Sequence, residues 1–450
     1  MKKQKIFSRL NWSTAGIPIG IFLVYLMIHQ FDDLRIAVPE WIGLSGIIIC
    51  LIAVGDYSFR LKSGWSTGFI VAMGAIYRFL FLFRAPELSD DIFRYVFDGH
   101  MLLLRHNPYQ AAPLDTIATH PGLSSLAALV NHGDLPTIYP PAAQFVFAVG
   151  ALAGGIFGMK LVLVLMDLLL CMLMAQMLKR LDQPRSRLIL YAWHPLPILE
   201  IAGSGHIDGV GLFFLFTAFI FLASNFSKET KPAVNQHPIF QWLTGCFFAA
   251  AVLTKWLPLM FLPGVLLMAG SRQLQRVALG FLISTLVMIG LFWPGIQNGF
   301  HTLFIYTTNW EFSAFAFRRL RDILDSGISA RLILAAVFSM IAGVIYFRCY
   351  RDMGGFLKQN STHNGLLVFQ ALYALSVTFL LLTPTLHPWY ALYLTAFLPF
   401  AAGPAGLVLS WSVFLGYRVV IGYAVTGQWQ ESDIMPVLIV AGPAVAFFAS

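Results

Sequence analysis

Charged residues are scarce in this chain of 450 residues: Asp, Glu, Lys and Arg make up 11% of it, whereas 58% is hydrophobic and 15% is aromatic. A soluble domain of this composition would have too few polar residues to cover its surface. The alternation of polar and apolar residues that is typical of membrane β-strands is also missing. The composition therefore predicts an all-α protein that crosses a membrane several times.

Cysteine is also rare. The chain has four, Cys50, Cys171, Cys246 and Cys349, in or beside apolar segments and at no spacing that is typical of a metal site. We expect them to be unpaired packing residues. The formal net charge of +8 does not indicate nucleic-acid binding, because Lys and Arg fall mostly in short loops between apolar segments. That distribution is typical of topology signals in membrane proteins.

Apolar runs recur from one end of the chain to the other, without a repeat of fixed period. Several are shorter than the ~20 residues that an upright span needs. We expect roughly 12–14 spans, some of them broken or re-entrant, in a single domain over residues 1–450. Two stretches between apolar runs are long, at 85–140 and 296–329. Long ordered loops between spans are more often functional than incidental.

Basic residues predict the orientation. The N-terminal Lys2, Lys3, Lys5 and Arg9 precede an apolar run that lacks a signal-peptide cleavage site, which indicates an uncleaved anchor with a cytoplasmic N-terminus. The same rule puts five later basic regions on the cytoplasmic side and the two long loops outside, provided that 141–158 lies on the surface or re-enters. These basic regions are Arg60 with Lys62, 179–187, 228–231, 272–276 and 348–358.

An acidic segment, Ser89-Asp90-Asp91-Ile92-Phe93-Arg94-Tyr95-Val96-Phe97-Asp98-Gly99, follows the third apolar run. On a helix, Asp90, Arg94 and Asp98 share one face, and Asp91 and Tyr95 form an adjacent stripe. The structural alternative is a helix end that neutralises itself through ion pairs with Arg94. Three carboxylates against one arginine leave a surplus, however, and a general base or a cation site requires such a surplus.

Other polar residues stand beside apolar runs on the same predicted face. Each has a structural explanation as well, such as a helix start, a cap, a snorkelling lysine or an interfacial aromatic belt. Carboxylates and cations together predict a catalytic cavity that takes a lipid phosphate and a hydroxyl acceptor. The further candidates are Asn107, Tyr109, His132, Tyr139, Glu200, His206, Asp208, Lys255, Arg318, Arg319, Arg321, His387 and Tyr390.

These motifs resemble those of the bacterial GT-C membrane glycosyltransferases, and more narrowly of the polyprenol-phosphate-mannose-dependent alpha-mannosyltransferases. The resemblance rests on Ser-Asp-Asp-Ile-x-Arg-Tyr-x-x-Asp-Gly, Asn-Pro-Tyr, Ala-Pro at 112–113, Tyr-Pro-Pro and Ala-Gly-Ser-Gly-His-x-Asp, over roughly residues 89–208. The order of Asp-Ile, Val-Phe-Asp and Pro-Tyr is also similar to the catalytic subunit of glycosylphosphatidylinositol mannosyltransferase I. Weaker similarity extends to Lys255 and 383–390.

The resemblance implies a GT-C-like bundle in the bacterial cytoplasmic membrane. It also implies inverting transfer of a hexose, mannose above all, from a polyprenyl-phosphate donor to a glycan or glycolipid acceptor at the extracytoplasmic face. Asp90 or Asp91 would be the base, and Arg94, Tyr95 and Asp98 would support it. Lys255 and the arginines at 318, 319 and 321 would hold the lipid phosphate, and the other candidates would bind substrate. A divalent cation such as Mg²⁺ or Mn²⁺ at the acids stays open, because one leaving phosphate needs few positive charges.

Two other classes of function fit parts of the pattern. A transporter or flippase of lipid-linked sugars would also span the membrane many times, but transporters usually show related halves and ionisable groups near the middle of the bilayer. Here the charges cluster at one face. A non-catalytic membrane scaffold leaves the acidic cluster unexplained. We therefore expect a glycosyltransferase.

Overall fold

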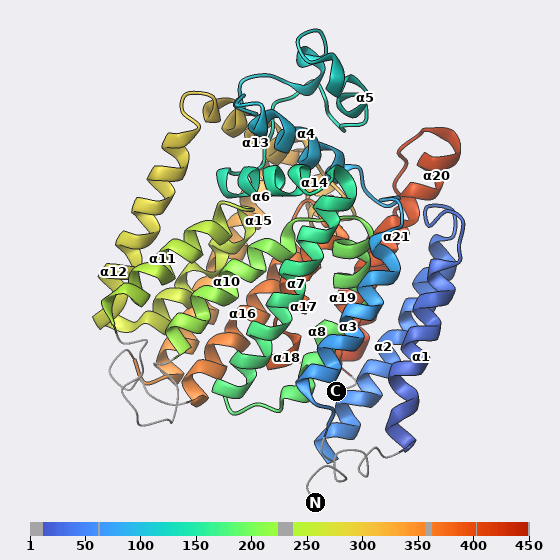
Figure 1. The fold of residues 1–450 in the computed structure, drawn as a ribbon. Coiled ribbons are helices and arrows are strands. Elements are labelled where there is room, and N and C mark those ends of the chain that lie inside the picture. The colour runs from blue at the N-terminus through green and yellow to red at the C-terminus, as the bar shows by residue number, and fades with distance from the viewer. Residues whose placement is uncertain (1–11, 62–63, 224–236, 356–361, 402, 449–450) are drawn as a thin grey trace, which may run out of the picture.

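The protein is described here from a computed structural model, which covers residues 12–61, 64–223, 237–355, 362–401 and 403–448. Over these ranges the chain is helical and has no strand; an isolated bridge joins Phe312 to Thr385. Most helices run side by side in one bundle, and others lie across one of its ends (Figure 1). The predicted all-α architecture is confirmed.

The α-helices differ widely in length, and the short ones mark places where an apolar run is broken. In chain order they are α1 (Trp12–His29), α2 (Val38–Leu61), α3 (Thr67–Leu82), α4 (Asp91–Leu103), α5 (Ser124–Ala127), α6 (Pro141–Leu152), α7 (Gly155–Arg180), α8 (Ile189–Ala192), α9 (Pro195–Pro197), α10 (Asp208–Leu222), α11 (Pro238–Val252), α12 (Leu262–Leu291), α13 (Ile296–Asn309), α14 (Phe315–Leu324), α15 (Gly327–Asp352), α16 (Thr362–Leu382), α17 (Leu392–Thr395), α18 (Leu398–Ala401), α19 (Pro404–Ser412), α20 (Arg418–Thr426) and α21 (Ile434–Phe448).

Six helical segments of the described residues are long and apolar enough to cross a membrane, and a bent pair, Pro195–Gly203 with Asp208–Leu222, adds a seventh if it is one span. Five more apolar helices have 10–17 residues. The chain is thus a multi-pass membrane protein. The predicted 12–14 spans would require the shorter helices to cross as well, so that count stays a prediction.

Several helices gather at one end of the bundle, which we call the α4 end. Figure 1 shows α4 and α6 lying across it, with α5, α13 and α14 beside them. As expected for 141–158, α6 is a short helix and not a separate long span. It begins at Pro141, and Gly154 and Gly155, with φ values of 126° and 65°, turn the chain into α7. Glycine adopts such positive φ values without the strain that a side chain would cause.

The helix α4 is fixed closely against α6. A Cβ atom on Gly99 would lie only 2.2 Å from the backbone oxygen of Phe147, so this contact requires glycine. The ring of Tyr95 stacks on that of Phe147, with centroids 4.4 Å apart. Because α4 cannot shift along α6, its first residue, Asp91, has a fixed position.

The opposite end of the bundle carries basic residues. The 26-residue helix α7 starts beside α6 and ends at Lys179 and Arg180, about 39 Å away for a straight helix. Several of the residues used to predict the orientation, namely Lys2, Lys3, Lys5, Arg9, Lys62, Lys228, Lys231 and Lys358, lie outside the described residues.

Candidate active site

The two aspartates at the start of α4 differ in their surroundings. Asp90 is the residue before the helix; it is exposed, and its side chain makes no capping hydrogen bond. Asp91 is the first helical residue. Its Oδ2 accepts a hydrogen bond of 3.0 Å from the Tyr139 hydroxyl, and its Oδ1 accepts one of 3.2 Å from Asn131 Nδ2. Of the two predicted catalytic acids, Asp91 is the one held by another predicted site residue, Tyr139, and by Asn131, which was not predicted.

Arg94 does not form the ion pairs that its helical spacing suggested. Its guanidinium donates instead to three backbone oxygens, those of Asn131, His132 and Leu135, at 3.0, 2.7 and 3.1 Å. Over the described residues, no carboxylate lies within ion-pairing distance of it. Arg94 thus holds the 131–135 loop over α4, which positions Asn131 beside Asp91.

Asp98 is buried between α4 and α6, where Gln144 Nε2 lies 3.5 Å from its Oδ2. Burial raises the pKa of Asp98 to about 6, although Arg94 and hydrogen bonds from Thr137 and Gln144 act in the opposite direction. Gln144 also donates to the backbone oxygen of Tyr139 at 3.2 Å. Asp98 therefore lies beneath the site and supports the segment that carries Tyr139.

The raised pKa of Asp98 predicts a dependence of stability on pH. Between about pH 4 and pH 6 the folded protein binds a proton at Asp98 that the unfolded chain releases, so stability falls as pH rises through this range. For a shift of about two units the loss is about 3 kcal/mol. Asp98→Asn carries no charge at this position. The thermal midpoint of this variant minus that of the wild type should therefore increase from pH 4 to pH 7.

The matched control is Asp115→Asn, which changes an exposed carboxylate in the same segment of the chain, residues 85–140. Its midpoint should follow the wild type at every pH. An Asp98→Asn midpoint that differs from the wild type by the same amount at pH 4 and pH 7 would show that Asp98 does not titrate in this range.

A broken span brings the next group of candidates together. After Pro195 and Pro197, residues Ile198–Gly203 form a π-helix, and the chain turns by 118° before α10 begins at Asp208. Gly205 has φ +82°, and a Cβ atom there would lie 2.5 Å from Ile92 of α4. The π-helix, the turn and the start of α10 therefore meet at the beginning of α4.

Three buried side chains come from this turn, Glu200, His206 and Asp208. His206 lies between two carboxylates: its Nδ1 is 3.7 Å from Asp91 Oδ2 and its Nε2 is 3.4 Å from Glu200 Oε2. The Tyr417 hydroxyl lies 2.9 Å and 3.0 Å from the two oxygens of Glu200. Asp91, His206 and Glu200 thus lie side by side, and neither ring nitrogen of His206 makes a hydrogen bond in the described structure.

Lys255 lies next to this group, with its ammonium 6.0 Å from the centre of the Trp389 ring, which stacks on His206. Its ammonium donates to Asp208 Oδ2 at 2.7 Å and lies over the ring of Tyr390, 5.1 Å from the centroid. The other oxygen of Asp208 is buried without a hydrogen-bond partner. Tyr390 in turn shares a hydrogen bond of 2.8 Å with Tyr306. A cation and a carboxylate that still has hydrogen-bonding capacity therefore lie beside His206.

A stack of aromatic rings forms one wall of the group. Trp389 stacks on His206 with centroids 3.9 Å apart, His387 stacks on Trp389 at 4.3 Å, and Phe312 stacks on His387 at 4.8 Å. Of these residues, His387 was predicted as a site residue, whereas Trp389, Tyr306 and Tyr417 were not. The sequence signal for Trp389 was its place between two predicted site residues, His387 and Tyr390.

Three predicted substrate residues have mainly structural contacts. Asn107 Nδ2 donates to the backbone oxygen of Phe292 at 2.9 Å, and the Tyr109 hydroxyl donates to that of Tyr139 at 2.5 Å. The exposed ring of His132 packs edge-on against Trp310, with centroids 4.6 Å apart. Tyr109 thus supports the segment around Tyr139, Asn107 holds its loop against Phe292, and His132 is exposed.

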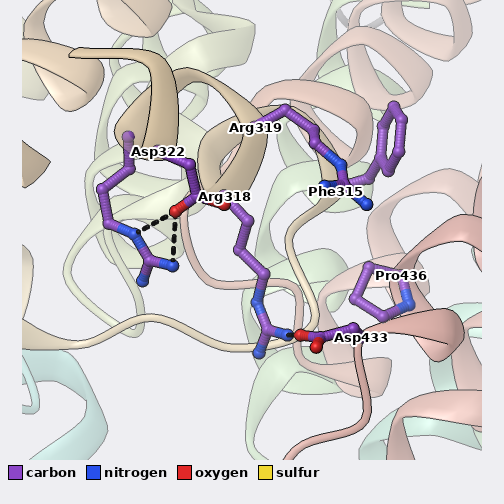
Figure 2. A pocket seen from close by; sticks show the side chains of 7 residues that line it. Phe315, Arg318, Arg319, Asp322, Asp433 and Pro436 are labelled. Carbon is purple, nitrogen blue, oxygen red and sulfur yellow. Dashed lines mark hydrogen bonds and ion pairs between the residues drawn. The ribbon is translucent and has the colours of Figure 1, made fainter. Parts of the chain in front are cut away.

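The three predicted arginines lie in a different pocket from Lys255. This pocket has a volume of about 190 Å³ and is lined by residues of α14 and of the start of α21 (Figure 2). Arg318 pairs with Glu431 and, at 3.6 Å, with Asp433. Arg321 pairs with Glu311 and Asp322. The four cations expected to hold one phosphate are thus divided between two places.

A comparison with family models identifies the chain. The model of the alpha-(1->6)-mannopyranosyltransferase N-terminal domain matches residues 23–271, more than half of the 450 residues. The chain belongs to the alpha-(1->6)-mannopyranosyltransferase family. No match is found among curated proteins or among solved structures.

The resemblance to GT-C mannosyltransferases is therefore confirmed, and the chain is a membrane glycosyltransferase that moves a sugar from a donor to a glycan acceptor. The matched residues include α4, the broken span and Lys255. They do not include the ring stack at 387–389, Tyr417 or the three arginines.

No group of three or more His, Cys, Asp or Glu side chains that could hold a metal ion occurs in the part of this mannosyltransferase that the structure describes. Asp91 and Glu200 accept hydrogen bonds from tyrosine hydroxyls, and one oxygen of Asp208 pairs with Lys255. The four cysteines are free, as predicted.

Proposed function

We propose that this mannosyltransferase moves mannose from a polyprenyl-phosphate donor to a hydroxyl of a lipid-linked or envelope glycan, with inversion at the anomeric carbon. The observation that carries the proposal is the Asp91 carboxylate, which borders a group that also contains a cation, Lys255. A base and a cation in one site are what a displacement with a phosphate leaving group needs.

Asp91 is the proposed general base. The acceptor oxygen attacks the anomeric carbon while its proton passes to the Asp91 carboxylate, and the bond from the anomeric carbon to the phosphate oxygen breaks with its electron pair going to the phosphate. A single displacement of this kind inverts the configuration. The hydrogen bonds from Tyr139 and Asn131 support this role, because they hold the carboxylate in one orientation.

Lys255 is the proposed partner of the leaving phosphate. Its side chain is 14% exposed, so its ammonium can reach a bound group while Asp208 and the Tyr390 ring hold it in place. A fixed cation stabilises the charge that builds on the leaving oxygen. Tyr139, His206 and Asp208 would line the sugar pocket, and the Trp389 ring stacked on His206 would support that pocket from behind.

The proposed site faces the extracytoplasmic side of the bacterial cytoplasmic membrane. Lys179 and Arg180 end α7 at the far end of the bundle from α4 (Figure 1), and short basic segments mark the cytoplasmic side of membrane proteins. On this argument, the α4 end and its acids lie outside.

A transfer assay with the purified protein in nanodiscs tests the donor and the stereochemistry. With a glycan acceptor, polyprenyl-phosphate mannose should yield a product whose new linkage has the opposite anomeric configuration, and GDP-mannose should yield none. Turnover with GDP-mannose alone would rule out the proposed donor, and a product with retained configuration would rule out the single displacement.

A further inference from the structure

The pocket between α14 and α21 lies apart from the proposed transfer site and has a chemistry of its own. Seven residues line it, and three of them are arginines; the lining is Phe315, Arg318, Arg319, Arg321, Asp322, Asp433 and Pro436. Figure 2 shows the side chains of Arg318 and Arg319 on the α14 side, facing Asp433 and Pro436. In the described part of the chain, none of these residues forms a hydrogen bond or an ion pair with Asp91, His206 or Lys255.

One arginine of the pocket, Arg319, has no carboxylate partner in the described structure, although four acids pair with the other two. Arg318 and Arg321 have carboxylate partners, but the side chain of Asp433 is 99% exposed, and an exposed pair at 3.6 Å contributes little. Arg319 forms no ion pair in the described part of the chain, and its guanidinium lies 5.9 Å from the centre of the Phe315 ring. The Nε atom of Arg318 is buried without a hydrogen-bond partner. The unpaired guanidinium of Arg319 and the Nε–H donor of Arg318 therefore remain for a ligand.

The first residues of α21 add to this potential. Asp433 immediately precedes the 15-residue helix, and Pro436 lies in its first turn, so the helix starts at the pocket. Backbone N–H groups at a helix start favour an anion. Arginine is also the residue that matches the planar, two-oxygen face of a phosphate group.

We propose that this pocket is an accessory site for a phosphate-bearing headgroup, distinct from the site where the donor phosphate leaves. The headgroup could belong to an anionic phospholipid of the surrounding leaflet or to a lipid-linked acceptor. Both present a phosphodiester at the membrane surface, and α14 lies at the α4 end of the bundle (Figure 1). This accessory site adds a second lipid contact to the proposed function, and its activity measurements rest on that function.

The site has a direct structural connection to the transfer site. The Glu431 carboxylate that pairs with Arg318 also accepts a hydrogen bond of 2.9 Å from the backbone N–H of Ser313. The neighbouring Phe312 is the last ring of the stack that ends on His206. A phosphate bound at Arg318 would compete with the Glu431 carboxylate for this arginine. A shift of Glu431 would also weaken its hydrogen bond to Ser313, next to Phe312 of the ring stack. We therefore expect occupancy to change turnover.

Two variants of Arg319 test the site without breaking an ion pair, because this arginine is exposed and unpaired in the described structure. Arg319→Gln removes the charge, and Arg319→Glu reverses it. The matched control is Arg418→Gln, an exposed arginine at the start of α20 that does not line the pocket. Loss of one arginine near an anionic headgroup should weaken binding about fivefold.

The lipid arm measures two quantities. Native mass spectrometry gives the retention of phosphatidylglycerol by the delipidated protein, and the transfer assay compares phosphatidylcholine nanodiscs with and without phosphatidylglycerol. The acceptor arm measures KM in phosphatidylcholine nanodiscs for a lipid-linked mannoside with a phosphodiester headgroup and for a neutral alkyl mannoside.

If the ligand is a membrane lipid, Arg319→Gln lowers phosphatidylglycerol retention and activation about fivefold, and Arg319→Glu lowers them further. If it is the acceptor, the same variants raise KM for the phosphodiester acceptor only. Arg418→Gln stays at wild-type values in either case. Arg319 variants that match Arg418→Gln in both arms overturn the accessory site. Retention needs no turnover, so a failure of the proposed function would be recognised separately.

Discussion

Replacing Asp91 by asparagine is expected to lower kcat/KM for mannose transfer by roughly 10²–10⁴-fold, the usual contribution of a positioned general base. Asparagine has nearly the same shape, and its oxygen can still accept the hydrogen bond from Tyr139, so the protein should fold normally. It cannot accept the proton of the attacking hydroxyl. Initial rates with polyprenyl-phosphate mannose and the thermal midpoint, measured on the same preparation, separate these two effects.

Asp90→Asn is the matched control, because it makes the same change one residue earlier in the chain. Asp90 is exposed and makes no capping hydrogen bond, so its variant should keep activity within a few-fold of the wild type. If Asp90→Asn were the inactive variant and Asp91→Asn the active one, the base assignment would have to be reversed. Near-normal turnover in both would remove the base from this helix end altogether.

The sequence was sufficient to predict that the polar residues lie together. Asp91, Glu200, His206 and Lys255 each stand next to the end of an apolar run, and charge in a membrane protein is costly unless it is paired or faces water. Because the predicted topology places these ends of the apolar runs at one face of the membrane, a common site was expected. The structure brings Asp91, His206 and Glu200 side by side and places Lys255 near the Trp389 ring that stacks on His206.

The choice between Asp90 and Asp91 could not be predicted in the same way. It depends on the residue at which α4 starts and on where Asn131 and Tyr139 lie, 40 and 48 residues further along the chain. Arg94 shows the same limit. Helical spacing offered it carboxylates one turn away, but in the structure the loop carbonyls around His132 take up its hydrogen bonds.

Ion pairs between buried residues inside the apolar runs were not predicted from the sequence. Arg78 and Asp167 form an ion pair of 2.6 Å with both side chains completely buried, and the Tyr191 hydroxyl donates to the same carboxylate at 2.6 Å. Hydropathy averages over such isolated charges, and nothing local links residues 89 positions apart. Glu431 and Asp433 could not be predicted as partners of Arg318 either, because they lie more than 100 residues further along the chain.

Replacing Lys255 by glutamine is expected to lower kcat by roughly 10²–10³-fold, because the leaving phosphate loses its fixed positive charge. The same change leaves Asp208 buried without its partner, and breaking a buried pair in this way costs about 3–5 kcal/mol of stability. A loss of activity in Lys255→Gln alone therefore does not tell catalysis from folding.

The double variant Lys255→Gln/Asp208→Asn separates the two effects. It removes both charges of the pair, so the thermal midpoint should return toward the wild-type value while kcat stays low. Asp208→Asn alone keeps the cation and should be clearly more active than the double variant. If instead the double variant regains activity together with stability, Lys255 only neutralises Asp208, and the charge that assists the leaving phosphate must come from elsewhere.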